Sequence, residues 1–509
     1  MQIVAAIDIG SNAMRMIVGQ LTELGRMELL ENVRIPIRLG QDAFSLGKLQ
    51  ETTMQQALDA FGHFRRVMDE YEITRVRAIA TSAMRESSNA FILIDRIRQV
   101  FGIEVEIING EEEARLIHRA VSNAIRLDGK RAVLIDIGGG SVEVTISHGR
   151  NIVSTESYNM GTVRLLQKLN SDAGSGLTLF PSKQPFALLV REYAEAARRR
   201  IDREIGSEKV DLCIGTGGNV EEIGKLRQKL LKQTSGQQVR MAELQDLIER
   251  LNQLSIKDRV RKLNLRPDRA DVILPAAIVL QLIARETGAR QILIPNVGLK
   301  DGLLVEMSEE LAKGRQTPRR DQVWEAARRL GRKYAYDEEH STSIARLAGQ
   351  LFDQSRELHA LDQEQRLLLE TGALLHDIGH FISTLEHEKH GYYILMATPI
   401  IGLNQRQNAI VANLIRYHRK PAPSIEDPNF KSLPSQDRMI VTRLCALIRL
   451  ADSLDISHTS HVKSVTLKKK KKRWELSMQG RGDLLLERWA LNKRRALFED
   501  IYGIELEVL

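Results

Sequence analysis

A strand–turn–strand unit that occurs twice limits the fold of this chain more than any other feature of its sequence. The apolar run 3–7 leads into Asp8-Ile-Gly-Ser-Asn12, and the apolar run 132–135 leads into Asp136-Ile-Gly-Gly-Gly-Ser141. In both copies a second strand-like run follows the turn, as expected of a hairpin. The copies lie about 128 residues apart, whereas solenoid repeats have periods of ~20–50 residues. The spacing therefore predicts a duplicated α/β domain.

The remaining patterns divide the 509 residues into four parts. Strand and helix patterns alternate up to about residue 125 and then start again. A basic segment with Gly and Pro, residues 313–320, indicates a linker, and residues 321–457 have helical periodicity only. The tail shows the pattern strand, strand, helix, strand. We therefore predict two α/β domains, an all-helical domain and a small α+β (β-β-α-β) domain at residues 1–125, 126–310, 315–460 and 461–509.

Three glycine-rich turns follow predicted strands, where backbone N–H groups can approach an anion without obstruction by side chains. They are Gly10-Ser-Asn12, Gly138-Gly-Gly-Ser141 and Gly215-Thr-Gly-Gly218. Neither the dinucleotide motif Gly-x-Gly-x-x-Gly nor the P-loop motif is present, which disfavours both of those classes. The alternative is that the glycines only form tight hairpins. Two copies that share Asp-Ile-Gly, with a third glycine cluster, favour phosphate binding.

Acidic residues accompany these turns. Asp8 and Asp136 each end an apolar strand, where an ionised carboxylate needs a partner or a metal. Glu143 lies in the returning strand, close enough across the turn to share an ion. Because Mg²⁺ binds carboxylates together with substrate phosphate, we predict Mg²⁺ held by these three residues. Glu111-Glu-Glu113 opens a helix, where the helix dipole alone also favours acids.

Composition restricts the ligand and the compartment. The chain has 74 Lys and Arg against 66 Asp and Glu, and this net charge of +8 attracts polyanions. Aromatic residues are only 5%, which disfavours nucleic-acid binding by base stacking. Two cysteines exclude a disulfide framework or a thiolate zinc site, which predicts the reducing cytoplasm. The sequence has no apolar run of ~18 residues and no basic N-terminal region, so we expect neither a membrane span nor a signal peptide.

Five motifs in order resemble those of a known family. They are Asp8-Ile-Gly-Ser-Asn12, Thr81-Ser-Ala-Met-Arg85, Gly110-Glu-Glu-Glu-Ala-Arg115, Asp136-Ile-Gly-Gly-Gly-Ser-Val-Glu143 and Gly215-Thr-Gly-Gly218. They are similar to the motifs of exopolyphosphatases and guanosine pentaphosphate phosphohydrolases, a family of the actin-like ATPase superfamily. The resemblance covers at least residues 1–305. It implies two ribonuclease-H-like domains with a cleft between them, Mg²⁺-dependent hydrolysis of terminal phosphoanhydride bonds, and a homodimer.

The resemblance also implies roles for single residues. Glu113 matches the base that activates water, and Asp136 and Glu143 match residues near the metal and that water. Arg85 matches the arginine that holds the terminal phosphate. The other predicted phosphate-binding residues, including two from the third glycine turn, are Gly10, Ser11, Asn12, Thr81, Ser82, Gly138, Gly139, Gly140, Ser141, Gly217 and Gly218. One departure is Ala13, where the family usually has serine, so one phosphate donor is missing.

Nine of the twelve histidines lie between His340 and His461. The set His340, His376-Asp377 and Asp452 resembles the H…HD…D signature of the HD phosphohydrolase superfamily. This resemblance implies an HD-like domain with a second divalent metal, and further histidines could support another ion: His380, His387, His390 and His418. In the polyphosphatase family the region is often degenerate and helps to bind the long substrate, so a structural role stays open.

The sequence predicts an exopolyphosphatase that releases orthophosphate from the ends of inorganic polyphosphate. The same chemistry would convert pppGpp to ppGpp. The basic C-terminal half, with the run Lys468–Arg473, favours the polymer, although such a run is also typical of a solvated strand edge. The alternatives are a guanosine pentaphosphate phosphohydrolase, a kinase or ATPase of the same superfamily, and an alarmone-binding regulator without turnover.

Overall fold

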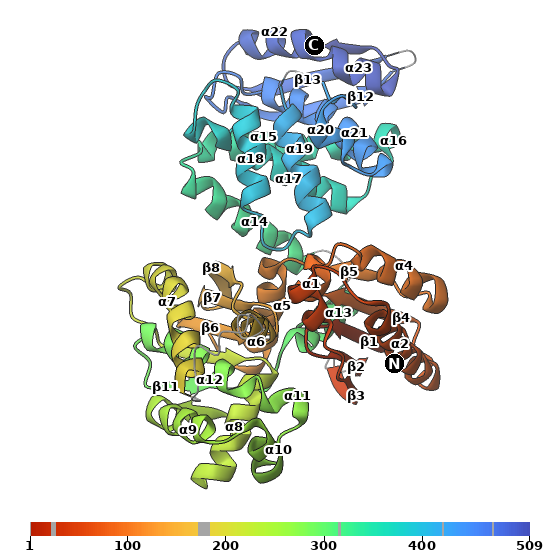
Figure 1. The fold of residues 1–509 in the computed structure, drawn as a ribbon. Coiled ribbons are helices and arrows are strands. Elements are labelled where there is room, and N and C mark those ends of the chain that lie inside the picture. The colour runs from red at the N-terminus through yellow and green to blue at the C-terminus, as the bar shows by residue number, and fades with distance from the viewer. Residues whose placement is uncertain (1, 22–26, 172–183, 314–316, 420–421, 471–472) are drawn as a thin grey trace. The chain divides into compact units, whose positions relative to one another are not determined.

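The computed structural model describes residues 2–21, 27–171, 184–313, 317–419, 422–470 and 473–509 (Figure 1). The chain forms two compact units, Met1–Arg315 and Gln316–Leu509. We describe each unit by itself. Among the described residues, no helix is both long enough and apolar enough to cross a membrane.

The first sheet of the N-terminal unit has five strands in the order β3-β2-β1-β4-β5. β1 pairs antiparallel with β2 and parallel with β4, so the first half of the sheet is a meander and the rest is built by crossovers. Its elements are β1 (Gln2–Ile9), β2 (Met14–Leu21), β3 (Met27–Ile35), α1 (Leu39–Leu46), α2 (Glu51–Glu70), β4 (Arg75–Ala80), α3 (Ser82–Glu86), α4 (Ala90–Phe101), β5 (Val105–Ile107) and α5 (Gly110–Ala124).

The second sheet repeats this strand order and adds one strand. Its order is β10-β11-β9-β6-β7-β8, in which β8, β7, β6, β9 and β11 correspond to the five strands of the first sheet. Its elements are β6 (Arg131–Ile137), β7 (Val142–His148), β8 (Asn151–Tyr158), α6 (Thr162–Ser171), α7 (Gln184–Ile205), β9 (Leu212–Thr216), α8 (Gly218–Leu231), β10 (Gln238–Arg240), α9 (Met241–Gln253), α10 (Ile256–Leu263), α11 (Pro267–Ala270), α12 (Ile273–Glu286), β11 (Gln291–Leu293) and α13 (Leu299–Lys313). The shared topology is that of a duplicated α/β fold.

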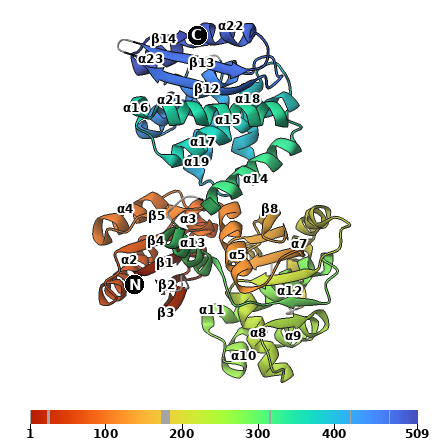
Figure 2. The ribbon, with the colours of Figure 1, turned by 180° about the vertical axis from the view of Figure 1, so that it is seen from behind.

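Helices α5 and α13 lie between the two sheets (Figures 1 and 2). They share one buried apolar cluster with residues of both sheets, including Val4 of β1, Leu134 of β6, Leu116 of α5 and Leu303 of α13. Helix α13 therefore packs against the first sheet although it follows the second sheet in the chain. This common core fixes the strand ends of the two sheets relative to each other.

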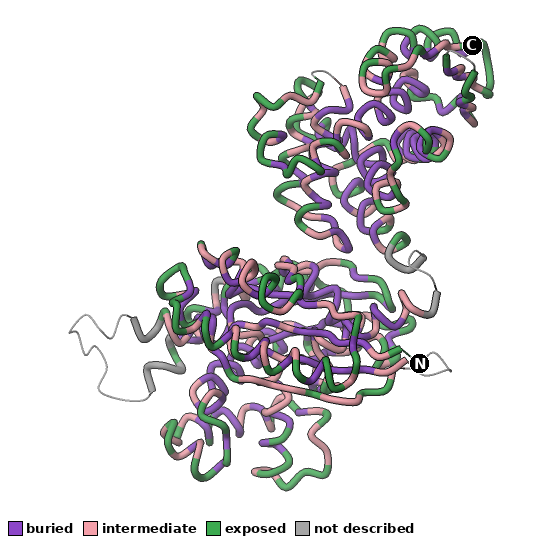
Figure 3. The backbone as a smooth tube through the Cα atoms, turned by 90° about the vertical axis from the view of Figure 1, so that its right-hand side faces the viewer, coloured by how far each residue is buried: buried purple, intermediate pink, exposed green. Residues whose placement is uncertain are grey.

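The C-terminal unit is mainly helical and carries a small sheet with the order β12-β13-β14. Its elements are α14 (Thr317–Lys333), α15 (Glu338–Gln354), α16 (Arg356–His359), α17 (Gln363–Leu375), the 3₁₀ helix η2 (Ile378–Phe381), α18 (His387–Ala397), α19 (Gln405–Tyr417), α20 (Pro428–Lys431), α21 (Ser435–Ser453), β12 (Val462–Lys469), β13 (Trp474–Gly480), α22 (Leu485–Arg494), α23 (Ala496–Tyr502) and β14 (Leu506–Val508). The tail thus has the strand, strand, helix, strand pattern, with its helix divided in two. Buried residues run through both parts of the unit (Figure 3). Leu467 and Trp474 of the tail belong to the same apolar core as Leu351 and Phe352 of α15.

Candidate functional site

Two hairpins of matching geometry meet in the N-terminal unit. In the first, Gly10 N–H donates to Ala13 O at 3.2 Å, and in the second, Gly138 N–H donates to Ser141 O at 3.1 Å. The pairing registers also correspond, because Asp8 faces Arg15 and Asp136 faces Glu143. The hairpins touch: a Cβ on Gly139 would lie only 3.0 Å from Cβ of Ser11. The two predicted phosphate loops are therefore neighbours.

A cavity of about 110 Å³ lies where the hairpins meet. Most of the sequence-predicted site residues line it, namely Asp8, Gly10, Ser11, Asn12, Thr81, Ser82, Glu113, Asp136, Gly138, Gly139, Ser141, Gly217 and Gly218. Ser11 Oγ and Ser82 Oγ lie 2.9 Å apart, which joins the first loop to the start of α3. The predicted residues Arg85, Gly140 and Glu143 are not among the residues that line the cavity. The cavity is thus lined by both predicted phosphate loops and by the predicted base, Glu113.

Three carboxylates converge beside this cavity. Glu113, Asp136 and Glu143 are all buried, and each offers an oxygen within 4.8 Å of the other two. Asp136 Oδ1 accepts a hydrogen bond from Thr216 Oγ1 at 2.5 Å, and Glu143 Oε1 accepts one from Ser157 Oγ at 2.8 Å. No described group hydrogen-bonds to Oε2 of Glu113 or Oε2 of Glu143.

Burial shapes the acidity of these groups. It raises the pKa of Asp136 to about 6, and burial together with Asp136 raises the pKa of Glu143 to about 7. Burial and the neighbouring Glu143 raise the pKa of Glu113 well above its ordinary value, while the Arg85 guanidinium opposes this shift. Burial also raises the pKa of Asp8. Close, buried carboxylates with unpartnered oxygens fit a divalent cation, because a cation would satisfy them together.

The structure groups the acids differently from the predicted Mg²⁺ set. Asp8 lines the same cavity, but Glu113 takes its place in the close group with Asp136 and Glu143. The hairpin register explains this, because Asp8 faces a cation, Arg15, across its strand pair. Asp136 faces a second acid at the corresponding position of the other hairpin.

Arg85 and Gly140 lie just behind the cavity wall. The Arg85 guanidinium donates to Ile108 O at 2.6 Å. A Cβ on Gly140 would overlap Ser82 Oγ and Cζ of Phe44. Gly140 is therefore required for the close approach of the second loop to α1 and α3.

Substitution of Gly140 by alanine should separate these elements. The added methyl group overlaps Ser82 and Phe44, and overpacking of this kind typically costs ~1–3 kcal/mol. We expect a lower melting temperature and a clear loss of turnover in Gly140→Ala. Gly62→Ala in α2 is the control, since its Cβ would meet only Phe101 at 3.8 Å. Equal behaviour of the two variants in thermal unfolding and phosphate-release assays would contradict this role.

Sequence reasoning missed three arginines that line the cavity, Arg15, Arg34 and Arg269. Arg34 forms an ion pair with Asp268, and burial together with the neighbouring arginines lowers the pKa of Arg269 to about 10. Arg15 could have been found, because it occupies the position in the first hairpin that Glu143 occupies in the second. No local pattern marks the other two. Together they give the cavity a cationic side that suits phosphate oxygens.

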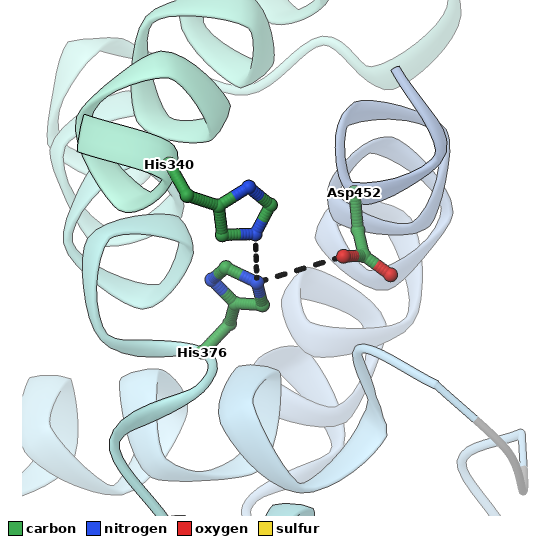
Figure 4. A group of neighbouring side chains, drawn as sticks. All are labelled: His340, His376 and Asp452. Atoms are coloured by element: carbon green, nitrogen blue, oxygen red, sulfur yellow. Dashed lines mark hydrogen bonds and ion pairs between the residues drawn. The ribbon is translucent and has the colours of Figure 1, made fainter. Parts of the chain in front are cut away.

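The C-terminal unit brings its predicted ligands together as well (Figure 4). His340 Nε2 lies 3.3 Å from His376 Nε2, and His376 Nε2 lies 3.5 Å from Oδ1 of Asp452. Asp377 Oδ2 is 3.4 Å from the same His376 nitrogen. Asp377 and Asp452 outweigh the effect of burial and raise the pKa of His376 to about 9.

The additional histidines divide into two kinds. His380, His387 and His418 approach Asp377 Oδ1, with Nε2 atoms 3.5, 3.3 and 3.6 Å away. Among the described residues, His390 belongs to none of the groups that could hold a metal ion. Burial and the neighbouring His376 lower the pKa of His418 to about 3.

A duplicated α/β fold, with two glycine hairpins facing buried acids, defines a phosphate-handling protein of the actin-like class. Comparison with known protein families identifies the family within this class. The chain matches the Ppx/GppA phosphatase family over residues 17–311 and domain III of Ppx/GppA phosphatases over residues 324–494. The chain belongs to the Ppx/GppA phosphatase family, whose members are phosphoanhydride hydrolases.

Individual relatives differ in their described activities. Proteins described as guanosine-5'-triphosphate,3'-diphosphate pyrophosphatases are similar to this chain in Vibrio campbellii (25% identity over 454 residues, 87% of this chain and 86% of the relative) and in Photobacterium profundum (26% over 459 residues, 88% and 85%). The structure of an exopolyphosphatase from Cytophaga hutchinsonii has 25% identity and a TM-score of 0.56, covering 60% of this chain and 98% of its own. The Aquifex aeolicus family member, at 22% identity, a TM-score of 0.52 and coverage of 62% and 99%, shares the fold.

Proposed function

We propose that this protein is an exopolyphosphatase that hydrolyses the terminal phosphoanhydride bond of inorganic polyphosphate. One observation carries the proposal: Glu113, whose Oε2 is buried without a hydrogen bond from the described chain, lines a cavity between two apposed glycine hairpins. A basic group and anion-binding loops in one water-restricted site are what hydrolysis of a phosphoanhydride requires.

In the proposed mechanism the terminal phosphate lies between the two glycine loops, and backbone N–H groups of the turn residues that follow Gly10 and Gly138 bind its oxygens. The oxygen of a water molecule bonds to the terminal phosphorus while the bridging P–O bond on the opposite side breaks. Glu113 takes the proton that the water loses, and orthophosphate and the shortened chain are the products. Arg15 and Arg269 would bind the phosphates that follow the terminal one.

Mg²⁺ would be held by Asp136 and Glu143, with Asp8 lining the same cavity, which leaves the neighbouring Glu113 free to accept the proton. When bound there, it would neutralise charge on the phosphate oxygens. Oε2 of Glu143 supports this assignment, because it is buried without a hydrogen bond from the described part of the chain. Arg85 would act on the site through its charge, since its guanidinium binds the carbonyl of Ile108.

The choice between polyphosphate and pppGpp is open to a direct experiment. We expect the kcat/KM for phosphate release with Mg²⁺ to be larger for polyphosphate than for pppGpp, because the cavity wall formed by Arg15, Arg34 and Arg269 suits a chain of phosphates. A larger kcat/KM for pppGpp would reassign the protein as a guanosine pentaphosphate phosphohydrolase. Absence of turnover with both substrates would overturn the proposal and favour an alarmone-binding regulator.

The superfamily also contains kinases and ATPases, so ADP binding is a useful counter-test. Calorimetric detection of ADP at the third glycine turn, Gly217-Gly218, would favour that alternative. We further propose that the protein is a homodimer and that it lies in the cytoplasm. The free, buried thiols of Cys213 and Cys445 are consistent with the cytoplasmic location.

A further inference from the structure

The second glycine loop of the N-terminal unit is held by the chain segment that leads into helix α6. Residues 161–164 donate backbone hydrogen bonds of 2.8–3.3 Å to the carbonyl oxygens of Gly138, Gly139 and Gly140. Since the C=O and N–H groups of a trans peptide point in opposite directions, the N–H groups of the three residues that follow are turned away from these donors. Gly139 and Ser141, which carry two of these N–H groups, line the phosphate cavity. The segment therefore determines which side of the loop presents its N–H groups.

Arg164 of α6 adds a side-chain donor to one of these carbonyl groups. Its Nε donates to Gly140 O at 2.7 Å, and the side chain is only 8% exposed. The same oxygen accepts the backbone N–H of Gly161 at 3.3 Å. Hydrogen bonds from a charged donor are stronger than those between neutral groups. The peptide between Gly140 and Ser141 is therefore held by two donors, one of which is charged and buried.

The rest of the Arg164 guanidinium contacts the first half of the N-terminal unit. Its Nη2 forms an ion pair with Glu86 at the end of α3, and its central carbon lies 4.0 Å from the centre of the Phe44 ring of α1. Helix α3 also carries Arg85, which precedes Glu86 directly. A planar guanidinium can bind a carbonyl and a carboxylate and stack on a ring at the same time, whereas a lysine ammonium cannot. Arg164 thus joins the second glycine loop to two helices of the first half.

The loop needs such support because its own sequence restricts it little. Three successive glycines, residues 138–140, allow backbone conformations that other residues avoid. Rotation of the peptide between Gly140 and Ser141 would withdraw the Ser141 N–H from the cavity and move the Gly140 carbonyl oxygen, which repels phosphate, toward it. Gly161 opposes this rotation through close packing, since a Cβ at this position would overlap Gly140 C and Ser141 N. One peptide is therefore restrained by a hydrogen-bonded guanidinium and by a backbone packed against it.

We propose that Arg164 is a positioning residue of the phosphate site, which holds the peptide between Gly140 and Ser141 so that the Ser141 N–H faces the terminal phosphate. Arg164 is not among the residues that line the cavity, so it acts through the loop rather than on the substrate. Because the same guanidinium binds Glu86, the loop is fully restrained only while α3 of the first half is in contact with it. This inference rests on the phosphate site of the proposed function, but not on polyphosphate as the substrate.

Comparison of Arg164→Gln with Arg227→Gln in the full-length chain tests this role. Arg227 of α8 is a matched control, because its buried guanidinium also donates to a carboxylate, that of Glu243, and to a backbone carbonyl, that of Ser235. Neither acceptor lines the phosphate cavity. Both variants should therefore lose stability, which thermal unfolding measures, but only Arg164→Gln should alter the phosphate site.

The expected effect on the site has a size and a direction. Loss of one donor to a reacting oxyanion typically lowers kcat by about 10²–10³-fold, and a loop that is misoriented part of the time should lose less, roughly tenfold. Arg164→Gln should also bind inorganic phosphate several-fold more weakly in calorimetry. Arg164→Lys should recover part of both losses, because an ammonium can still donate to Gly140 O. Wild-type kcat and phosphate affinity in Arg164→Gln, or equal losses in Arg227→Gln, would overturn the proposal.

A double-mutant cycle separates positioning from general damage to the fold. Gly161→Ala disturbs the same peptide by direct overlap. If both substitutions act through this peptide, Arg164→Gln combined with Gly161→Ala should lose little more kcat/KM than the more impaired single variant. Independent effects would multiply instead, and that outcome would contradict the proposal.

Phosphate binding keeps this test separate from the proposed function, because it involves no turnover. If the wild type released no phosphate from polyphosphate, the exopolyphosphatase proposal would fail. Weaker phosphate binding by Arg164→Gln than by Arg227→Gln would still support the positioning role in that case. Equal phosphate binding by the two variants would refute the role, whatever the substrate of the protein.

Discussion

Replacement of Glu113 by glutamine is expected to abolish phosphate release while the protein stays folded. Loss of a general base typically lowers turnover by about 10²–10⁴-fold. Glutamine has the same size but accepts no proton, so substrate affinity should change little. Stability should be unchanged or higher, because the wild-type carboxyl is buried, lies against Glu143 and leaves Oε2 unpartnered. The combination of lost turnover and retained melting temperature is the result to look for in phosphate-release and thermal-unfolding assays.

The adjacent acid provides the control for this experiment. Glu111 lies in the same first turn of α5 but is only partly buried and does not line the cavity. Glu111→Gln should therefore keep close to wild-type turnover. Turnover retained in Glu113→Gln, or lost equally in both variants, would show that Glu113 is not the base.

The three successive acids at the start of α5 show what could be predicted from the sequence and what could not. The helix dipole explains acids in a first turn, and only the resemblance singled out Glu113. The structure separates them by helical rotation. Glu113 enters the cavity, whereas Glu112 accepts two hydrogen bonds of 2.7 Å from the buried Arg115. The sequence pattern contained both acids, but which side each one faces depends on how α5 packs between the two sheets.

Packing between residues that are far apart in the sequence also explains why the cavity arginines and the position of the C-terminal strands were not predicted. The repeated Asp-Ile-Gly unit predicted the two matching sheets, because hairpins and strands are local features. Arg34 and Arg269 reach the cavity from β3 and α11, and no spacing links them to the glycine turns. The C-terminal strands were predicted as a separate small domain, yet Leu467 of β12 lies in the core of the helices. A short amphipathic strand does not reveal which surface will cover it.

In the C-terminal unit the sequence indicated the candidate metal ligands but not the residues that orient them through hydrogen bonds. His340, His376, Asp377 and Asp452 were predicted from their resemblance to the HD signature, and the structure brings them within reach of one another. Asp455, which orients His340, carried no signal because it lies outside the motif.

Replacement of Glu306 by glutamine should be the most destabilising of the substitutions considered. Glu306 of α13 lies between two arginines of the first half of the unit, 2.8 Å from Nη2 of Arg115 and 2.5 Å from Nη1 of Arg77. Arg115 is only 1% exposed. Glu112 still pairs with Arg115, so glutamine leaves the arginine cluster only partly compensated; loss of a buried ion-pair partner typically costs ~3–5 kcal/mol. Equilibrium denaturation of Glu306→Gln should show a loss of this size at pH 7.

An exposed ion pair of the same helix is the matched control. Arg75 and Glu310 lie 2.8 Å apart, but their side chains are 37% and 33% exposed. Solvent screens such a pair, so Glu310→Gln should cost at most ~1 kcal/mol. Similar losses in the two variants would mean that burial of the Glu306 cluster does not determine its contribution.

The pH dependence gives an independent measure of the same cluster. Burial disfavours the ionised Glu306, but Arg115, Arg77 and Arg119 outweigh it and lower the pKa of Glu306 to about 2. A carboxyl whose pKa is lower in the folded state stabilises the protein above its unfolded pKa, about 4.3 for Glu. This stabilisation is lost as the pH falls from there through the folded pKa. The difference in unfolding free energy between wild type and Glu306→Gln should therefore be constant from about pH 8 to 5 and should decrease below about pH 4. A difference that does not change with pH would mean that the charge of Glu306 is not what joins α13 to the first half of the unit.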